Sequence, residues 1–340
     1  MSSIRPTADT GGEAGAPRVS AASLQRSVTV LALVALAALI PLLGPSLAMD
    51  GTGEAAAPGV GGIAFLRTVL FAAVCVPAGE LFVTRLARRV PGAPIQDAPR
   101  SWAPVSAAAG FVAALGLASV VATGNLVPRR LSDMDIGGLY QTRDGALALL
   151  EVNAFVVLGL CALSRRPGTQ VWPLAAVAVA EALRAHPTTE QSPLIGSGLT
   201  LVHVACAALW AGGLLYVLRT LLRWRGSAPG EGAALLGLYA RVAAVLLAAI
   251  TATGVCSTLR RMPPGTVLDQ LTTTAYGRTL LAKVLLVVVV AVLALWARRR
   301  LRRAADPLTA YSPARAEVVV LGLVVAVSAL LTAVPVPIRW

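Results

Sequence analysis

Charged residues are scarce in this chain. Only 13% of its 340 residues are Asp, Glu, Lys or Arg, whereas soluble globular domains carry about a quarter. Apolar residues make up 56% of the sequence, and the mean hydropathy is +0.75. This composition excludes a soluble globular protein and predicts an integral membrane protein.

Several sequence patterns are also missing. The apolar runs do not alternate with polar residues as the strands of a membrane barrel do, and there is no sustained heptad or Gly-X-Y period. The four cysteines each lie in an apolar run, which excludes a disulfide scaffold and predicts reduced thiols. The chain has no Gly-Lys-Ser/Thr phosphate loop and no HExxH motif, so it is not expected to be an ATP-driven pump or an enzyme.

Long continuous apolar runs are abundant. A run of about twenty apolar residues can cross a bilayer as a helix. Nine such runs predict an all-α, polytopic helical membrane bundle. They cover residues 27–48, 63–86, 102–122, 145–164, 170–186, 199–221, 235–257, 277–297 and 315–335. Nine crossings would put the two ends of the chain on opposite sides of the membrane.

The N-terminal region allows two interpretations. Residues 1–26 are expected to form a cytoplasmic tail, and residues 27–48 an anchor helix. Alternatively, 27–48 is a signal peptide, because Ser46-Leu47-Ala48 resembles a cleavage site of small residues. The apolar run is long for a signal core, which favours a retained helix.

Basic residues outnumber acidic residues by 29 to 16, which gives a formal charge of +13. The arginines cluster at the ends of the apolar runs, as expected for cytoplasmic connections that contact lipid headgroups. We therefore expect the bilayer as a partner and no nucleic acid. The connections around 87–100, 223–232 and 298–312 are predicted to be cytoplasmic, in a bacterial inner membrane.

Short motifs recur in the two halves of the chain. The recurring pairs are Ala78-Gly79-x-Leu81 with Ala211-Gly212-x-Leu214, Ala122-Thr123-Gly124 with Ala252-Thr253-Gly254, and Thr142-x-x-Gly145 with Thr274-x-x-Gly277. The members of each pair are roughly 130 residues apart and keep the same order. This predicts a parallel repeat of two four-helix halves, about 62–187 and 199–335, with a pseudo-twofold axis along the membrane normal.

The chain has only two histidines, His186 and His203. Both are predicted at the outer ends of consecutive helices joined by a short loop, so we expect them to be neighbours. Cys206, one turn after His203, and Met262, on the same outer side, are further candidate ligands. Imidazole and thiol together suit copper or zinc, and a thioether binds Cu(I). The alternative is that the imidazoles are solvated at the membrane surface and the sulfur atoms only pack in the core.

The ionisable residues within or at the edges of the predicted helices include Glu80, Glu151, Glu181, Arg241 and Lys283. A charge in the hydrocarbon region is costly unless it is paired or faces a polar cavity. Glu151 and Lys283 occupy equivalent positions in the repeat, so we predict a salt bridge between them. Glu181 is predicted either to orient His186 or to pair with Arg184.

Two motifs resemble the CopD family of bacterial copper-resistance membrane proteins. In the first, His203 is followed by small residues and then by Trp210-Ala211-Gly212-Gly213-Leu214. The second runs from Tyr239-Ala240-Arg241 through Thr253-Gly254 and Leu271-Thr272-Thr273-Thr274-Ala275-Tyr276-Gly277-Arg278 to Lys283. The resemblance covers roughly residues 62–335.

The resemblance implies copper movement across, or handling at, the inner membrane, most often import. Three features depart from the family pattern: the first apolar segment is additional to the usual eight helices, Ala185-His186-Pro187 replaces a Gly-His pair, and no copper-binding β domain is present. A periplasmic or extracytoplasmic copper-binding protein is a further expected partner.

Three functions are consistent with these features. The first is a copper permease with an outward-facing site of His203 and His186, joined by Cys206 or Met262. The second is a haem-binding electron-transfer protein with the two histidines as axial ligands. The third is a copper-handling partner in the assembly of an oxidase.

Overall fold

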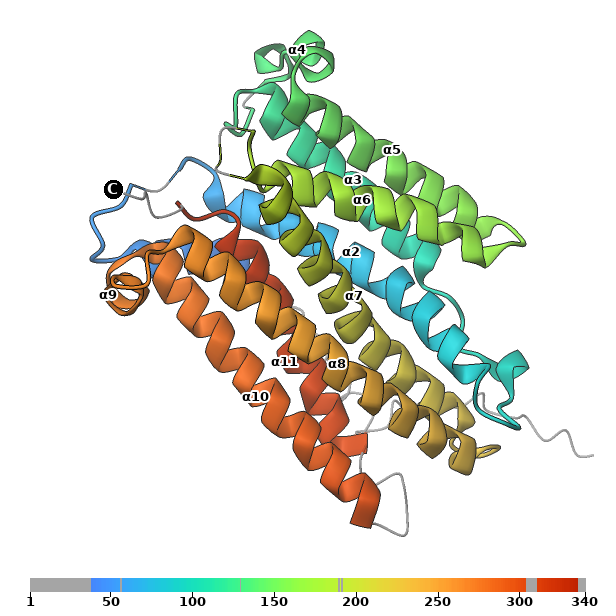
Figure 1. Ribbon diagram of the computed structural model, residues 1–340. Helices are drawn as coiled ribbons and strands as arrows, with labels where there is room; N and C mark the ends of the chain where they lie inside the picture. Colours follow the sequence, from blue (N-terminus) through green and yellow to red (C-terminus); the bar gives the residue numbers. More distant parts are fainter. Residues whose placement is uncertain are drawn as a thin grey trace, which may run out of the picture. The chain divides into compact units, whose positions relative to one another are not determined.

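A computed structural model describes residues 38–55, 57–128, 130–188, 190, 192–303 and 311–335. All of them belong to one compact unit, Ala37–Trp340. Helices dominate this described part, which contains no β-strand (Figure 1). The predicted all-α, polytopic bundle is confirmed. The predicted tail at 1–26 and the first part of the segment 27–48 lie outside the described residues.

Among the described residues, the bundle contains eight main helices that follow a shorter helix, Ala38–Met49. The main helices are α2 (Val60–Ala87), α3 (Ala103–Ala122), α5 (Arg143–Leu163), α6 (Val171–Arg184), α7 (Pro193–Trp224), α8 (Pro229–Arg261), α10 (Ala275–Arg303) and α11 (Tyr311–Leu331). Two short helices, α4 (Ile136–Gln141) and α9 (Val267–Thr273), immediately precede α5 and α10.

Six of these helices are long and apolar enough to cross a membrane: α2, α3, α5, α7, α8 and α10. The other predicted segments are shorter where the structure describes them. The described apolar stretches there are Ala38–Met49 and Ala316–Leu331, and α6 has 14 residues. At 1.5 Å per residue, α6 is about 21 Å long, less than the ~30 Å hydrocarbon core. The protein is thus a multi-pass membrane protein, with six full-length spans among the described residues.

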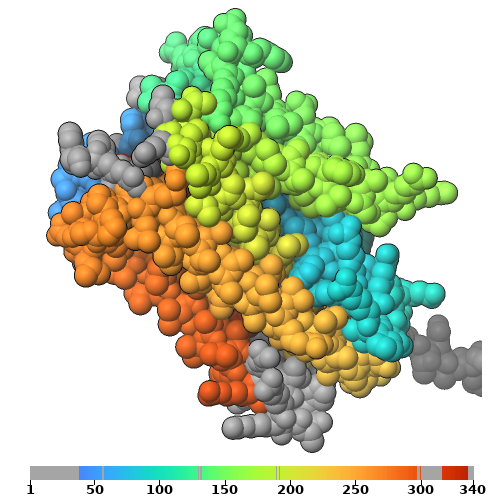
Figure 2. Space-filling model, in the orientation of Figure 1, coloured from blue at the N-terminus to red at the C-terminus, as the bar shows by residue number. Residues whose placement is uncertain are grey.

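The helices pack mainly with the neighbours that the repeat predicts. In the first half α2 packs on α3, α3 on α5, and α5 on α6; in the second half α7 packs on α8, and α10 on α11. The largest contact between the halves joins α2 to α7, and α11 also packs on α2. In Figure 2 the first half (cyan to green) and the second half (yellow to orange) form adjoining surfaces.

Two equivalent glycines meet where α2 crosses α7. A Cβ atom added to Gly79 would overlap the backbone of Gly212, and one added to Gly212 would overlap the carbonyl of Cys75. Glycine lets two helix backbones approach this closely. Gly79 and Gly212 occupy equivalent positions in the recurring motif. Equivalent residues meet only close to a twofold axis, so a pseudo-twofold axis would pass near their contact.

The same local structure begins α5 and α10. Thr142 Oγ1 accepts a hydrogen bond from the Gly145 backbone N–H (3.1 Å), and Thr274 Oγ1 accepts one from Gly277 (3.0 Å). Each threonine caps its helix by satisfying a free N–H group. A Cβ atom at either glycine would overlap the backbone of the preceding short helix, α4 or α9. This shared geometry explains the Thr-x-x-Gly motif and supports the repeat.

Candidate metal-binding site

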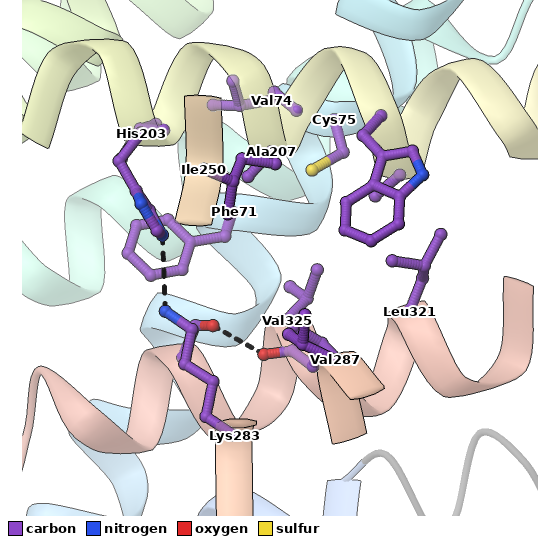
Figure 3. Close-up of a pocket in the computed structure, with 16 residues that line it drawn as sticks. Phe71, Val74, Cys75, His203, Ala207, Ile250, Lys283, Val287, Leu321 and Val325 are labelled. Atoms are coloured by element: carbon purple, nitrogen blue, oxygen red, sulfur yellow. Dashed lines mark hydrogen bonds between the residues drawn. The ribbon is translucent and has the colours of Figure 1, made fainter. Parts of the chain in front are cut away.

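A cavity of about 100 Å³ lies between helices α2, α7, α8, α10 and α11 (Figure 3). Most of its lining is apolar, including Phe71, Trp210 and Ile250. The side chains in this lining that could interact with a bound ion are His203, Lys283, Cys75 and Ser328. The cavity therefore offers a few soft or basic groups within apolar surroundings.

Thr253 determines which nitrogen of His203 faces the cavity. The Thr253 hydroxyl donates to the backbone carbonyls of Ala249 (2.7 Å) and Ile250 (3.1 Å) one turn earlier in α8. Its oxygen is 3.0 Å from His203 Nδ1, and we assign Nδ1–H as the donor because the hydroxyl hydrogen already has these two acceptors. Nε2 therefore carries the lone pair, the group through which a neutral imidazole binds a metal.

Lys283 lies beside that lone pair. Its Nζ atom is 3.5 Å from His203 Nε2 (dashed in Figure 3). Lys283 comes from α10, Thr253 from α8 and His203 from α7, so these three side chains all come from the second half of the repeat. Neither Thr253 nor Lys283 was predicted as a partner of His203.

The second imidazole has a different environment. His186 is buried; its Nδ1 is 2.6 Å from Glu190 Oε2, and its Nε2 is 2.8 Å from Thr200 Oγ1. Both nitrogens are engaged by protein groups. Thr200 precedes His203 by one turn of α7, so both imidazoles contact this helix, but only His203 lines the cavity.

The sulfur atom that lines the cavity belongs to Cys75, and not to the predicted candidates Cys206 and Met262. Cys75 lines the cavity with His203, whereas Cys206 packs against the buried apolar cluster that includes Trp210 and Leu214. Met262 is fully buried in a separate cluster that contains Met49. Only the packing of α2 on α7 brings Cys75 to the cavity, and the local sequence around His203 carries no signal of that contact.

The predicted salt bridge between Glu151 and Lys283 is wrong. Glu151 pairs instead with Arg184 (2.7 Å), which also lies 3.8 Å from Glu181. The prediction that Glu181 pairs with Arg184 is thus confirmed. The error has a physical reason: α5 packs on α3 and α6 of its own half, while Lys283 lies on α10, which packs on α11.

The other predicted intramembrane charges lie apart from the cavity. Glu80 accepts hydrogen bonds from Ser101 Oγ (2.5 Å), the Trp102 backbone N–H (2.8 Å) and Arg219 (3.2 Å). Arg241 is exposed on α8. Sequence analysis also missed the buried charge of Glu317, which is 5% exposed on α11.

Within the described residues, no group of three or more His, Cys, Asp or Glu side chains is placed to hold a metal ion. The described residues therefore form neither a carboxylate-rich nor a multi-histidine metal site. The cavity offers instead one imidazole nitrogen and one thiol among apolar groups, a combination that suits a soft ion of low coordination number.

Comparison with known proteins finds a family similarity over part of the chain. Residues 233–331 match the CopD family, described as copper resistance protein D. No curated protein and no solved structure matches the chain. The matched region runs from α8 to α11 and includes Thr253 and Lys283. The resemblance drawn from the motifs is confirmed over this region.

Proposed function

We propose, from the CopD match over residues 233–331, that this protein is a copper permease that imports copper across the bacterial cytoplasmic membrane. The observation that carries the proposal is the lone pair of His203 Nε2, which faces a cavity inside the bundle. Copper is the transported substrate, and no chemical conversion is required of the protein.

The surroundings of His203 support capture from the outer side. His203 is eleven residues into α7, which begins after the connection predicted to be extracytoplasmic. Thr253 holds Nδ1–H, and such a partner orients a ligating imidazole and makes it more basic. We expect a periplasmic copper-binding protein to deliver the ion to this side.

A second soft donor lies deeper along α7. The carbonyl of Cys75 lies against Gly212, nine residues beyond His203 and therefore about 13 Å further along the helix. The Cys75 thiol lines the same cavity as His203. We propose that the ion passes from the imidazole toward this thiol, at the level where the two halves of the repeat cross.

The haem alternative is less well supported. It needs both imidazoles as axial ligands of one macrocycle. Both nitrogens of His186 already have protein partners, Glu190 and Thr200, at 2.6 and 2.8 Å. The assembly-partner alternative would use the same copper site and differs from a permease only in net transport.

Cellular copper content measures the proposed function. Expression of the wild-type protein should raise copper content, His203→Ala should remove the rise, and His186→Ala should reduce it. Thr251→Ala is the control substitution, because Thr251 is exposed on α8. A fall in cellular copper would indicate export, and no change would favour a role in the assembly of an oxidase. A rise that survives in His203→Ala at equal expression would contradict the His203 site, and a Soret band in the purified protein would favour haem.

A further inference from the structure

Lys283 is the one lysine in a chain with 29 basic residues, all the others being arginine. It lies in α10, lines the cavity, and places Nζ 3.5 Å from His203 Nε2. Lysine carries a compact charge on a flexible four-carbon stem, whereas a guanidinium is larger and planar. The position next to His203 thus holds the side chain best able to move within a small cavity.

The amine and a metal ion need the same electron pair. Nδ1–H of His203 is committed to Thr253, so Nε2 is the nitrogen left to bind a metal. An N–H group of Lys283 lies next to that nitrogen and can donate to it. A metal ion at Nε2 therefore requires Lys283 to move away.

The cavity contains an alternative acceptor for the displaced amine. The Ser328 hydroxyl donates to the Val324 carbonyl (2.6 Å), so its oxygen keeps lone pairs to accept a hydrogen bond. Ser328 lines the same cavity as Lys283. A volume of about 100 Å³ leaves room for the side chain to shift, since one water molecule occupies about 30 Å³ in the liquid.

The charge of Lys283 also bears on which ion can bind. Among the described residues that line the cavity there is no carboxylate to neutralise a metal ion. Coulomb repulsion from an ammonium group scales with the charge of the ion, and it is strong where water is scarce. A divalent ion is therefore repelled about twice as strongly as a monovalent ion at the same position.

We propose that Lys283 is a built-in competitor for His203 Nε2: it occupies the site when no metal is bound, and it restricts the site to a soft monovalent cation, Cu(I). This inference rests on the proposed function, because it names the substrate's oxidation state and a residue that controls access to the same site. In the metal-bound state the Lys283 amine turns to Ser328.

Binding of Ag(I), a redox-stable substitute for Cu(I), to the purified full-length protein tests the proposal. Lys283→Met keeps the length of the side chain but removes the competing amine. We expect it to bind Ag(I) at least about tenfold more tightly than the wild type. Its gain in affinity for Zn(II) should be larger still. Arg241→Met, which removes an exposed charge outside the cavity, should leave both affinities unchanged.

Two further measurements separate this role from a general effect on folding. The gain should vanish in the double variant Lys283→Met with His203→Ala. In wild-type protein labelled with ¹³C at lysine Cε, the single lysine signal should shift on addition of Ag(I), and in His203→Ala it should not.

Three results would overturn the proposal: equal or weaker Ag(I) binding by Lys283→Met, a gain that persists without His203, or an equal gain for Zn(II). These assays measure occupancy rather than transport. Failure here with normal copper uptake would therefore remove only the role of Lys283. Unchanged cellular copper on expression would instead contradict the proposed function.

Discussion

At the scale of single residues, the Thr253 hydroxyl holds His203 in the orientation that exposes Nε2. Thr253→Val keeps the shape of the side chain but removes the acceptor for Nδ1–H. Loss of such a partner typically costs 10–100-fold in metal affinity. We expect Ag(I) affinity of the purified protein to fall by about that factor in Thr253→Val, and to stay near the wild-type value in Thr253→Ser. Thr251→Val, an exposed substitution on the same helix, is the matched control. Equal affinities for Thr253→Val and Thr251→Val would show that the hydroxyl does not orient the imidazole.

At the scale of helices, the crossing of α2 and α7 depends on the absence of a side chain at Gly79. In Gly79→Ala the new methyl group would overlap the backbone of Gly212, which cannot move as a side chain can. Overpacking of this kind costs about 1–3 kcal/mol, so we expect a clear fall in the thermal unfolding midpoint in detergent. Gly62→Ala, on the same helix but with open space around it, should change the midpoint little. Equal midpoints for the two variants would contradict close packing at Gly79.

The ion pair between Glu151 and Arg184 joins α5 to α6. Glu151 is fully buried, and removing one partner of a buried pair costs about 3–5 kcal/mol because the other charge is left uncompensated. Glu151→Gln and Arg184→Met should each lower stability in detergent. The charge exchange Glu151→Arg with Arg184→Glu should recover part of the loss. The exchange Glu151→Lys with Lys283→Glu should recover none, and recovery by that pair would restore the predicted contact that the structure contradicts.

At the scale of the whole molecule, the distribution of arginine predicts the orientation in the membrane. Ser227, between α7 and α8, should face the cytoplasm, and Thr266, between α8 and α9, should face outward. Both are exposed, so cysteines introduced there can react with a maleimide that does not cross membranes. In a Cys256→Ser background, intact cells should be labelled at Thr266→Cys and only lysed cells at Ser227→Cys. The opposite pattern would invert the topology and put His203 near the cytoplasm.

The helical membrane class could be predicted from local sequence alone, and so could His203 as a candidate ligand. In lipid, the backbone of a continuous apolar run must satisfy its hydrogen bonds within its own segment. Such a run therefore forms a helix, whatever the rest of the fold is. The Thr-x-x-Gly caps before α5 and α10 are local in the same sense. His203 could be singled out because imidazoles are so few in this chain and because its motif resembles a known family.

The contacts between distant residues could not be predicted from the sequence, because they depend on how the helices pack. A repeat shows that two positions are equivalent, but a twofold axis brings equivalent residues together only when they lie close to it. Gly79 and Gly212 meet at the crossing of α2 and α7, whereas Glu151 and Lys283 lie on helices that pack within separate halves. For the same reason Cys75, more than a hundred residues from His203 in the chain, shares its cavity, while Cys206, one turn away, packs elsewhere. Contacts between helices depend on how whole apolar faces pack, and no local pattern around His203 encodes that packing.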